Sequence, residues 1–237
     1  MLYSVDTATF AGVLVENSPS LNPTQFVAIE SWVKPQVKTP TIVFDNSSSG
    51  ATFSYFMSID GGTGKASWFS TIGGVGKNIV NVTGIIPGVW NFVSGFYDGS
   101  GVYLCANGQQ IGTVAATGDL GTNPGQLRLG RYFNAGVPSF CRMTSSRVLT
   151  RSYSLADHRS RYYDAIDNAE MRTGLSLDFT MNEGSGTVVA DSSGLSNNGT
   201  FSRNVWAADT PFKVRSVESG RVSESNRSSA SSRVQIT

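Results

Sequence analysis

The chain has 237 residues, of which 39% are apolar and 15% charged, and its formal net charge is +1. This length suffices to bury one large core without disulfides or metals, and a net charge near zero argues against nucleic acid as the main partner. The longest apolar runs are about six residues, too short for a membrane-spanning helix, and no signal peptide is visible.

Alternating apolar and polar residues predict strands through the first 150 residues. At 26–35 the alternation places Val27, Ile29 and Val33 on one face and Trp32 on the other, so Trp32 either faces outward or lies beneath another layer. Further strands are expected at 52–60, 65–72, 79–83, 89–97, 101–106, 110–115, 126–131, 139–149 and 175–181. At least ten short strands of this spacing predict a sandwich or barrel.

The segment at 52–60 is expected to form a hairpin with 65–72 through the glycine-rich turn at 61–64, and a second turn is expected at 73–78. In the first strand of this hairpin the alternation assigns four apolar side chains to one face: Phe53, Tyr55, Met57 and Ile59.

One helix is expected, at 154–170. Ser154 caps it, with Asp157 completing an approximate capping box. An apolar stripe at helical spacing predicts that the helix lies on the sandwich; its members are Leu155, Tyr162, Ile166 and Ala169. After Phe212 the chain becomes rich in serine and arginine, which predicts a flexible arm or one ordered by a partner.

The residues that commonly carry catalysis are sparse. His158 is the only histidine and is expected on the helix surface among arginines, where it completes neither a metal site nor a catalytic triad. Cys105 and Cys141 are expected as buried small side chains, with a single bridge as the alternative. No two acidic residues before position 150 lie two apart on one strand, as a paired-carboxylate glycosidase could use.

Sugar binding requires less: an aromatic platform and polar groups for hydroxyls. The candidate carbohydrate-binding residues are Trp32, Tyr55, Trp68, Tyr132, Asn107 and Arg131. The competing interpretation is that these aromatic side chains pack in the core. Calcium is the plausible metal because it accepts oxygen ligands from loops, and Asp6 and Asp98 are its candidate ligands.

Several stretches together carry a family resemblance: ENSPSLNP (16–23), IESWVKP (29–35), GVWNFVSGFYDGSGVYLCANGQQIGT (88–113), LGRYF (129–133) and FCRMTSSRVLTRSYSLADHRSRYY (140–163). In order and spacing they resemble the laminin-G-like branch of the concanavalin A-like lectin/glucanase superfamily. The resemblance implies an all-β, two-sheet antiparallel jelly-roll sandwich with one short C-terminal helix. It also implies carbohydrate binding and a structural calcium ion.

Two departures from the family pattern bear on function. Val5-Asp6-Thr7 stands where members commonly carry Phe-Asp-Gly, which weakens calcium ligation by Asp6. The catalytic Glu-x-Asp-x-x-Glu strand of the glucanases is absent from the sequence, so no enzyme is expected. The segment at 181–201 resembles one that normally precedes the first strand, which indicates either a permuted jelly roll or a truncated second repeat.

We therefore expect a sandwich plus helix over 1–170, an extension at 171–212 that completes it, and an arm at 213–237. The expected function is non-catalytic surface recognition through binding of cell-surface or extracellular glycans. The expected setting is a phage virion component such as a head-decoration, fibre or tail protein. The alternatives are a purely structural decoration anchored by the arm, and a carbohydrate-active enzyme. The expected partners are glycans and other virion proteins, without nucleic acid or membrane insertion, and sheet edges would allow a homo-oligomer.

Overall fold

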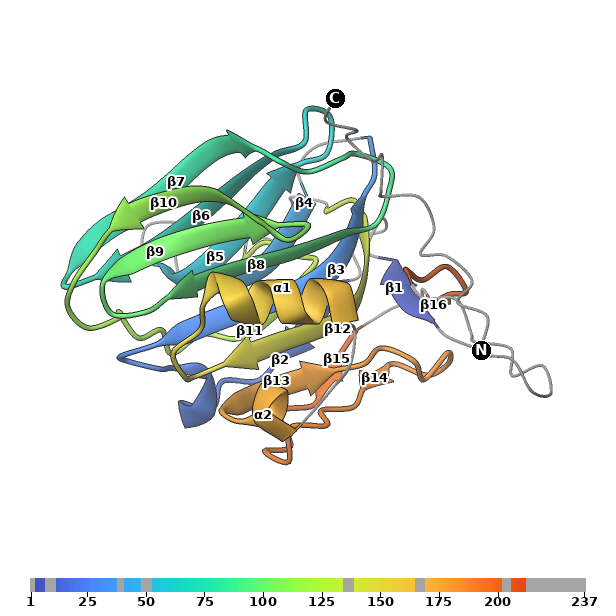
Figure 1. The fold of residues 1–237 in the computed structure, drawn as a ribbon. Helices are drawn as coiled ribbons and strands as arrows, with labels where there is room; N and C mark the ends of the chain where they lie inside the picture. The colour runs from blue at the N-terminus through green and yellow to red at the C-terminus, as the bar shows by residue number, and fades with distance from the viewer. Residues whose placement is uncertain are drawn as a thin grey trace, which may run out of the picture.

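Two antiparallel sheets of eight strands each lie face to face and enclose the main core (Figure 1). This arrangement confirms the expected two-sheet jelly-roll sandwich. The computed structural model describes residues 3–6, 12–37, 41–47, 53–133, 139–164, 169–201 and 206–211. The expected arm at 213–237 lies outside the described residues.

The first sheet has the strand order β10-β9-β8-β3-β12-β1-β16, and β13 also pairs with β12. Its strands are β1 (Ser4–Asp6), β3 (Val27–Pro35), β8 (Asn91–Tyr97), β9 (Gly101–Ala106), β10 (Gln109–Ala115), β12 (Cys141–Leu149), β13 (Leu175–Phe179) and β16 (Trp206–Ala207).

The second sheet has the order β14-β15-β2-β11-β4-β5-β6-β7. Its strands are β2 (Val13–Val15), β4 (Thr41–Ser47), β5 (Phe53–Asp60), β6 (Lys65–Ile72), β7 (Val75–Thr83), β11 (Leu127–Leu129), β14 (Val188–Val189) and β15 (Gly199–Thr200). A short 3₁₀ turn, η1 (Pro19–Leu21), follows β2.

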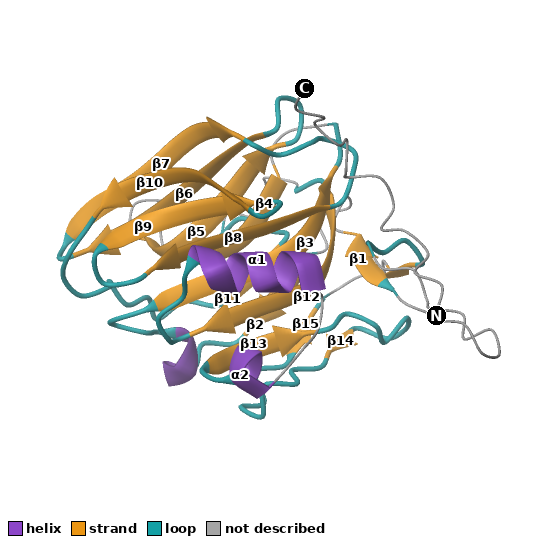
Figure 2. Cartoon of the chain, viewed as in Figure 1, coloured by secondary structure: helices purple, strands orange, loops and turns teal. Residues whose placement is uncertain are grey.

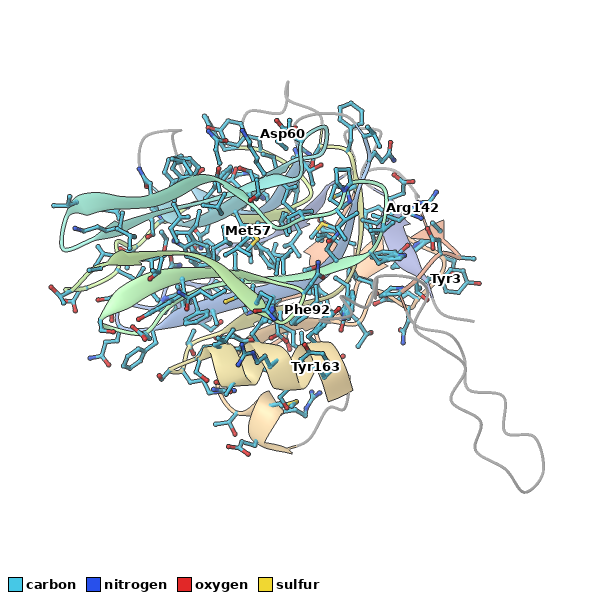
Figure 3. The ribbon with its side chains drawn as sticks, turned by 45° about the horizontal axis from the view of Figure 1, so that its top comes forward. Tyr3, Met57, Asp60, Phe92, Arg142 and Tyr163 are labelled. Carbon is cyan, nitrogen blue, oxygen red and sulfur yellow. The ribbon has the colours of Figure 1, made fainter. Side chains whose placement is uncertain are left out.

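The core between the sheets is built from the inward residues of both. Val27, Ile29 and Val33 belong to it, as their alternation predicts, and Figure 3 shows Met57 between the layers. Trp68 is fully buried there because Gly95 on the facing sheet carries no side chain: a Cβ at Gly95 would lie 2.2 Å from Trp68 Cε3. Dense packing of this kind tolerates no added methyl group without rearrangement.

The strands differ from the sequence prediction in several places, three of which shape the second sheet. β4 was not expected, because its sequence TIVFDNS does not alternate. The turn before β7 is only Gly73-Gly74, both with positive φ, so the strand begins at Val75 and not at 79. Phe53 does not share the core face of Tyr55, because the pairing of β5 with β4 shifts between Asn46 and Ser47. An irregularity of this kind reverses the alternation of side chains.

The C-terminal segment pairs with both sheets beside the N-terminal strands. β15 pairs with β2 in the second sheet, while β16 pairs with β1 in the first. β13 extends along β12, and β14 pairs with β15 at the sheet edge. The two ends of the described chain, β1 and β16, therefore lie side by side (Figure 1), and Figure 2 shows β1 apart from the helices.

Helix α1 (Leu155–Asp164) lies across the outer face of the first sheet, as expected (Figure 1). Ser154 and Asp157 form the expected capping box: Asp157 Oδ2 accepts from the Ser154 backbone N–H at 2.9 Å. A second short helix, α2 (Ala169–Arg172), follows. Of the predicted stripe, Ile166 lies outside the described residues.

The helix is the layer that covers Trp32. The ring of Trp32 lies 5.9 Å from that of Tyr162 on α1 and 5.3 Å from that of Phe92 on β8. Figure 3 shows Phe92 between the sheet and the helix. Of the two positions expected for Trp32, the covered one is confirmed.

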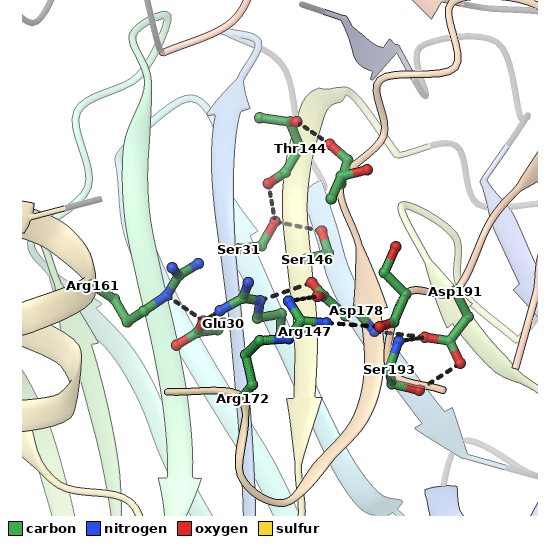
Figure 4. A network of polar contacts seen from close by, with 12 residues as sticks. Glu30, Ser31, Thr144, Ser146, Arg147, Arg161, Arg172, Asp178, Asp191 and Ser193 are labelled. Carbon is green, nitrogen blue, oxygen red and sulfur yellow. Dashed lines mark hydrogen bonds and ion pairs between the residues drawn. The ribbon is translucent and has the colours of Figure 1, made fainter. Parts of the chain in front are cut away.

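A buried ion network joins the same layers (Figure 4). Glu30 on β3 accepts hydrogen bonds from Arg161 of α1 at 2.9 Å and from the Tyr153 hydroxyl at 2.8 Å. Arg147 on β12 pairs with Asp178 on β13 at 2.8 Å. Because an unpaired charge in the interior is very costly, these contacts fix the helix and β13 against the sheet.

His158 is fully buried, and its expected surface position is wrong. The backbone N–H of Gly108 donates to Nε2 at 3.0 Å, so Nδ1 carries the proton and donates to Ser94 Oγ at 2.8 Å. Burial lowers the pKa of His158 to about 3, and the charge of Arg159 adds to this effect. The uncharged imidazole of His158 thus links α1 to the β9–β10 turn by a hydrogen bond.

Replacing Glu30 should destabilise the fold strongly. Glu30→Ala leaves Arg161 without its buried partner, so we expect the free energy of unfolding to fall by about 3–5 kcal/mol in urea titrations. The matched control, Glu16→Ala, removes an exposed carboxylate and should cost less than about 1 kcal/mol. Equal losses for the two variants would contradict the importance of the network.

The stability should fall on acidification because of His158. Its folded pKa of about 3 lies below the unfolded value of 6.5, so the unfolded state binds the extra proton between these limits. Stability from this group is complete above about pH 6.5 and is lost toward pH 3, by about 1.4 kcal/mol per pH unit. His158→Gln should flatten the measured slope by that amount; an unchanged slope would show that the histidine is not the cause.

Candidate binding surface

Three of the aromatic residues predicted to bind sugar lie inside the molecule. Tyr55 and Trp68 are fully buried between the sheets, and Trp32 lies beneath α1. The Tyr55 hydroxyl donates to the backbone carbonyl of Leu21 at 3.1 Å, and Trp68 Nε1 donates to Ser70 Oγ at 3.0 Å. These three assignments are corrected here, because a covered ring cannot stack on a sugar.

Asn107 has a structural task in the turn between β9 and β10. Its φ is 50°, and its side-chain oxygen accepts from the Phe92 backbone N–H at 3.0 Å. Its amide nitrogen donates to Asn91 at 2.9 Å. The Asn107-Gly108 pair therefore suits a left-handed turn, and its side chain is occupied within the protein.

The two predicted calcium ligands lie at opposite ends of the first sheet. Asp6 is in register with Arg142 and, through it, with Lys34, whereas Asp98 follows Tyr97, which pairs with Val27. Lys34 and Val27 are themselves seven strand positions apart, about 23 Å at ~3.3 Å per residue, so Asp6 and Asp98 cannot share one ion. Within the described residues no three His, Cys, Asp or Glu side chains gather as a metal site would need.

Of the two remaining predicted residues, which follow β11, Tyr132 belongs to a group of aromatic rings on the second sheet, whereas Arg131 lies against Gly12 at its Cβ. We call this group the outer aromatic cluster; its members are Phe53, Phe56, Phe69, Tyr132 and Phe133. Phe56 alternates with the core residues Tyr55 and Met57, so the cluster lies on the face turned away from the core. All members except Phe56 are partly exposed.

The rings of the cluster support one another. Phe56 lies at the centre, with ring centroids 5.2 Å from Phe53, 5.6 Å from Phe69 and 5.8 Å from Tyr132. Tyr132 and Phe133 meet edge to face at 4.5 Å. Edge-to-face and tilted pairs at such distances are favourable contacts, so the rings form a continuous, pre-organised apolar surface.

A buried carboxylate anchors one side of this surface. Asp45 on β4 accepts hydrogen bonds from Ser47 Oγ and from the backbone N–H of Phe133. Burial raises the pKa of Asp45, against the opposing effects of Ser47, Arg128 and Phe133. Burial and the nearby Asp45 charge likewise raise the pKa of Tyr132. Asp45 thus holds the Tyr132–Phe133 segment in place without being exposed itself.

Polar side chains flank the rings on the same face. Asn78 on β7 is in register with Phe69, and Ser58 is in register with Ser67, so each pair shares one face of the sheet. Asn78 is exposed, and both serines are partly exposed. Rings bordered by an amide and hydroxyls can contact the apolar face of a sugar and its hydroxyl groups together.

Most residues of this surface are not among those predicted from the sequence. Phe56 and Phe69 could be read from the alternation as facing away from the core, opposite Tyr55 and Trp68. The position of Phe53 on this face depends on the irregular pairing of β5, and the position of Asp45 depends on strand β4, which was not expected. Neither irregularity has a sequence signal of its own.

Among its described residues, this surface has no accessible acid, histidine or cysteine that could act in catalysis. Among the described residues next to the rings, Asp45 is the carboxylate, and it is fully buried with both oxygens bound. The Ser94–His158 pair lies inside the molecule, out of reach of a substrate. Within the described part of the chain, no helix has the length and apolar character needed to traverse a bilayer.

A family model described as the concanavalin A-like lectin/glucanases superfamily matches residues 7–157, which is more than half of the chain. No curated protein matches it in sequence. The match covers all strands of the described chain from β2 to β12 and the start of α1.

Solved structures share the fold at low sequence identity. A candidate carbohydrate binding protein from Bacteroides ovatus has a TM-score of 0.66 and 15% identity, over 87% of this chain and 60% of that one. The binding domain of Paraclostridial Mosquitocidal Protein 1 follows at 0.55 and 12%, over 68% and 43%. A SAP-like pentraxin from Limulus polyphemus reaches 0.52 and 14%, over 68% and 81%. The chain thus spans less than two thirds of the length of the first two proteins.

Proposed function

The chain belongs to the concanavalin A-like lectin/glucanases superfamily, and from this premise we propose that it is a non-catalytic carbohydrate-binding module whose sugar site is the outer aromatic cluster. The observation that carries the proposal is the set of partly exposed rings on the outer face of the second sheet. Within the described chain, helix α1 covers the outer face of the first sheet and leaves this face open. The description of the Bacteroides ovatus protein as a candidate carbohydrate binding protein supports it.

The outer aromatic cluster offers a shallow site on which a sugar ring can stack. The rings of Phe69 and Tyr132 offer apolar faces to the C–H side of a pyranose, while Asn78 offers an amide at the border. The rings already rest on one another, so binding would order few side chains and lose little entropy. A shallow platform of this kind suits one face of a longer glycan.

The absence of a usable acid pair near the rings supports binding without turnover. Glycoside hydrolysis needs two carboxylates about 5–10 Å apart across the scissile bond. In the described surroundings of the cluster, the buried Asp45 cannot supply even one of them. A bound glycan would therefore be released unchanged.

A virion setting remains a prediction from the family resemblance, as does a purely structural role. Mass spectrometry of purified particles tests the first, because a virion component must be present in them. A folded protein that binds no glycan on a broad array would favour the structural role.

Truncating the exposed rings should weaken glycan binding. For a glycan found on an array, Tyr132→Ala or Phe69→Ala should raise Kd at least about fivefold, since a ring contact is worth about 1 kcal/mol. Tyr163→Ala is the matched control, because Tyr163 is an exposed ring on α1 at the other face. If the control loses as much affinity as Tyr132→Ala, the site is not the cluster.

Calcium is tested by the same array in the presence of a chelator. We propose that any calcium ion is structural and lies away from the outer aromatic cluster, whose one neighbouring carboxylate is already occupied. Chelation should then leave the Kd of the folded protein unchanged, whether or not the melting temperature falls. Loss of binding without loss of stability would place calcium in the sugar site.

A further inference from the structure

A small cleft lies at the end of the first sheet where β3 ends and β12 begins. It has a volume of about 180 Å³ and is lined by Lys34, Pro35, Gln36, Gly88 and Arg142. Figure 3 shows Arg142 beside Tyr3 at this end of the molecule. The volume is below the ~300–1,000 Å³ of drug-sized pockets, so the cleft suits a single small unit.

Two cations face each other across this cleft. Lys34 on β3 and Arg142 on β12 are direct cross-strand partners on the outer face of the sheet. Like charges in this position repel, so the pair requires an anion between them. Trp90, just before β8, adds an indole N–H from the next strand in the same row.

The structure places two carboxylates there: Asp6 Oδ2 accepts from Arg142 Nε at 3.2 Å, and between the two cations lies the side chain of Asp209. Its Oδ2 accepts from Arg142 Nη1 at 2.7 Å and from Lys34 Nζ at 2.9 Å, and its Oδ1 accepts from Trp90 Nε1 at 3.2 Å. Burial opposes ionisation of Asp209, but the hydrogen bonds from Lys34, Trp90 and Arg142 lower its pKa overall. The three donors thus form a site for a carboxylate.

Apart from these side-chain contacts, the segment around Asp209 is held by few contacts with the described residues. The two-residue strand β16 pairs with β1, and Ser4 Oγ donates to the backbone carbonyl of Asp209 at 2.7 Å. The side chains of Lys34, Arg142 and Asp209 each remain about one third exposed. Ion pairs with this exposure contribute about 0–1 kcal/mol, so a competing carboxylate can displace Asp209.

We propose that this cleft binds the carboxylate of an acidic saccharide, such as a uronic acid unit, and that Asp209 occupies the carboxylate position until the ligand arrives. The saccharide ring would lie in the adjoining cleft, against the side chains of Pro35 and Gln36. The site shares no residue with the outer aromatic cluster and goes beyond the function proposed for that cluster, so each proposal can fail without the other.

The test compares the full chain with its Asp209→Asn variant by calorimetry, using trigalacturonate and its methyl ester as probes. Asn keeps the size of the side chain and removes the competing charge. We expect Asp209→Asn to bind trigalacturonate about three- to tenfold more tightly than the unchanged chain, because two exposed ion pairs no longer compete, and to gain nothing toward the neutral ester. Adding Arg142→Gln should abolish the gain, whereas adding Lys77→Gln, a cation on β7, should preserve it.

Three results would overturn the proposal. The first is equal affinity of Asp209→Asn and the unchanged chain for trigalacturonate, and the second is an equal gain toward the ester. The third is binding of a peptide with the sequence of residues 206–210 but not of trigalacturonate, which would make the cleft a peptide-docking site. If Asp209→Asn fails to fold, the indole N–H resonance of Trp90 in the unchanged chain decides: it must shift with trigalacturonate and not with the ester.

Discussion

The pairing of Arg147 with Asp178, next to Glu30, is the contact on which the layered structure depends. The three side chains come from adjacent strands, β12, β13 and β3, and each is at most 4% exposed. A charge at that depth is tolerated only with its partner in place. The network therefore ties the C-terminal strand β13 and, through Arg161, helix α1 to a sheet that the family-matched segment builds.

This constraint also decides which face can bind. Because α1 is fixed over β3, β8 and β12, the aromatic side chains of that face, Trp32 and Phe92 among them, become a second core. The second sheet has no such cover in the described chain, so Phe69 and Tyr132 keep exposed area there. Both faces of the first sheet are therefore packed against other layers, whereas the outer face of the second sheet stays accessible in the described chain.

Much of the fold could be predicted from periodicity and turn residues, since alternation on β3 assigned Val27, Ile29 and Val33 to the core. What failed depends on local irregularity. Ser145, with φ 52°, adds a residue to β12 opposite β3, so Arg142 and Arg147 point to the same outer face although their spacing is odd. The burial of Trp68 under Gly95 and of His158 under α1 depends on long-range packing, which alternation does not encode.

The C-terminal segment contacts two arginines of β12, Arg147 through Asp178 on the neighbouring strand β13 and Arg142 through Asp209 just after β16, and the two contacts differ in depth. Asp178 and Arg147 are 1% and 4% exposed, so separating them would leave a charge uncompensated in the interior. Asp209 and Arg142 are 33% and 34% exposed, so water can solvate both when they part. The same pairing chemistry is therefore a permanent joint at one end of β12 and an exchangeable contact at the other, and burial alone makes the difference.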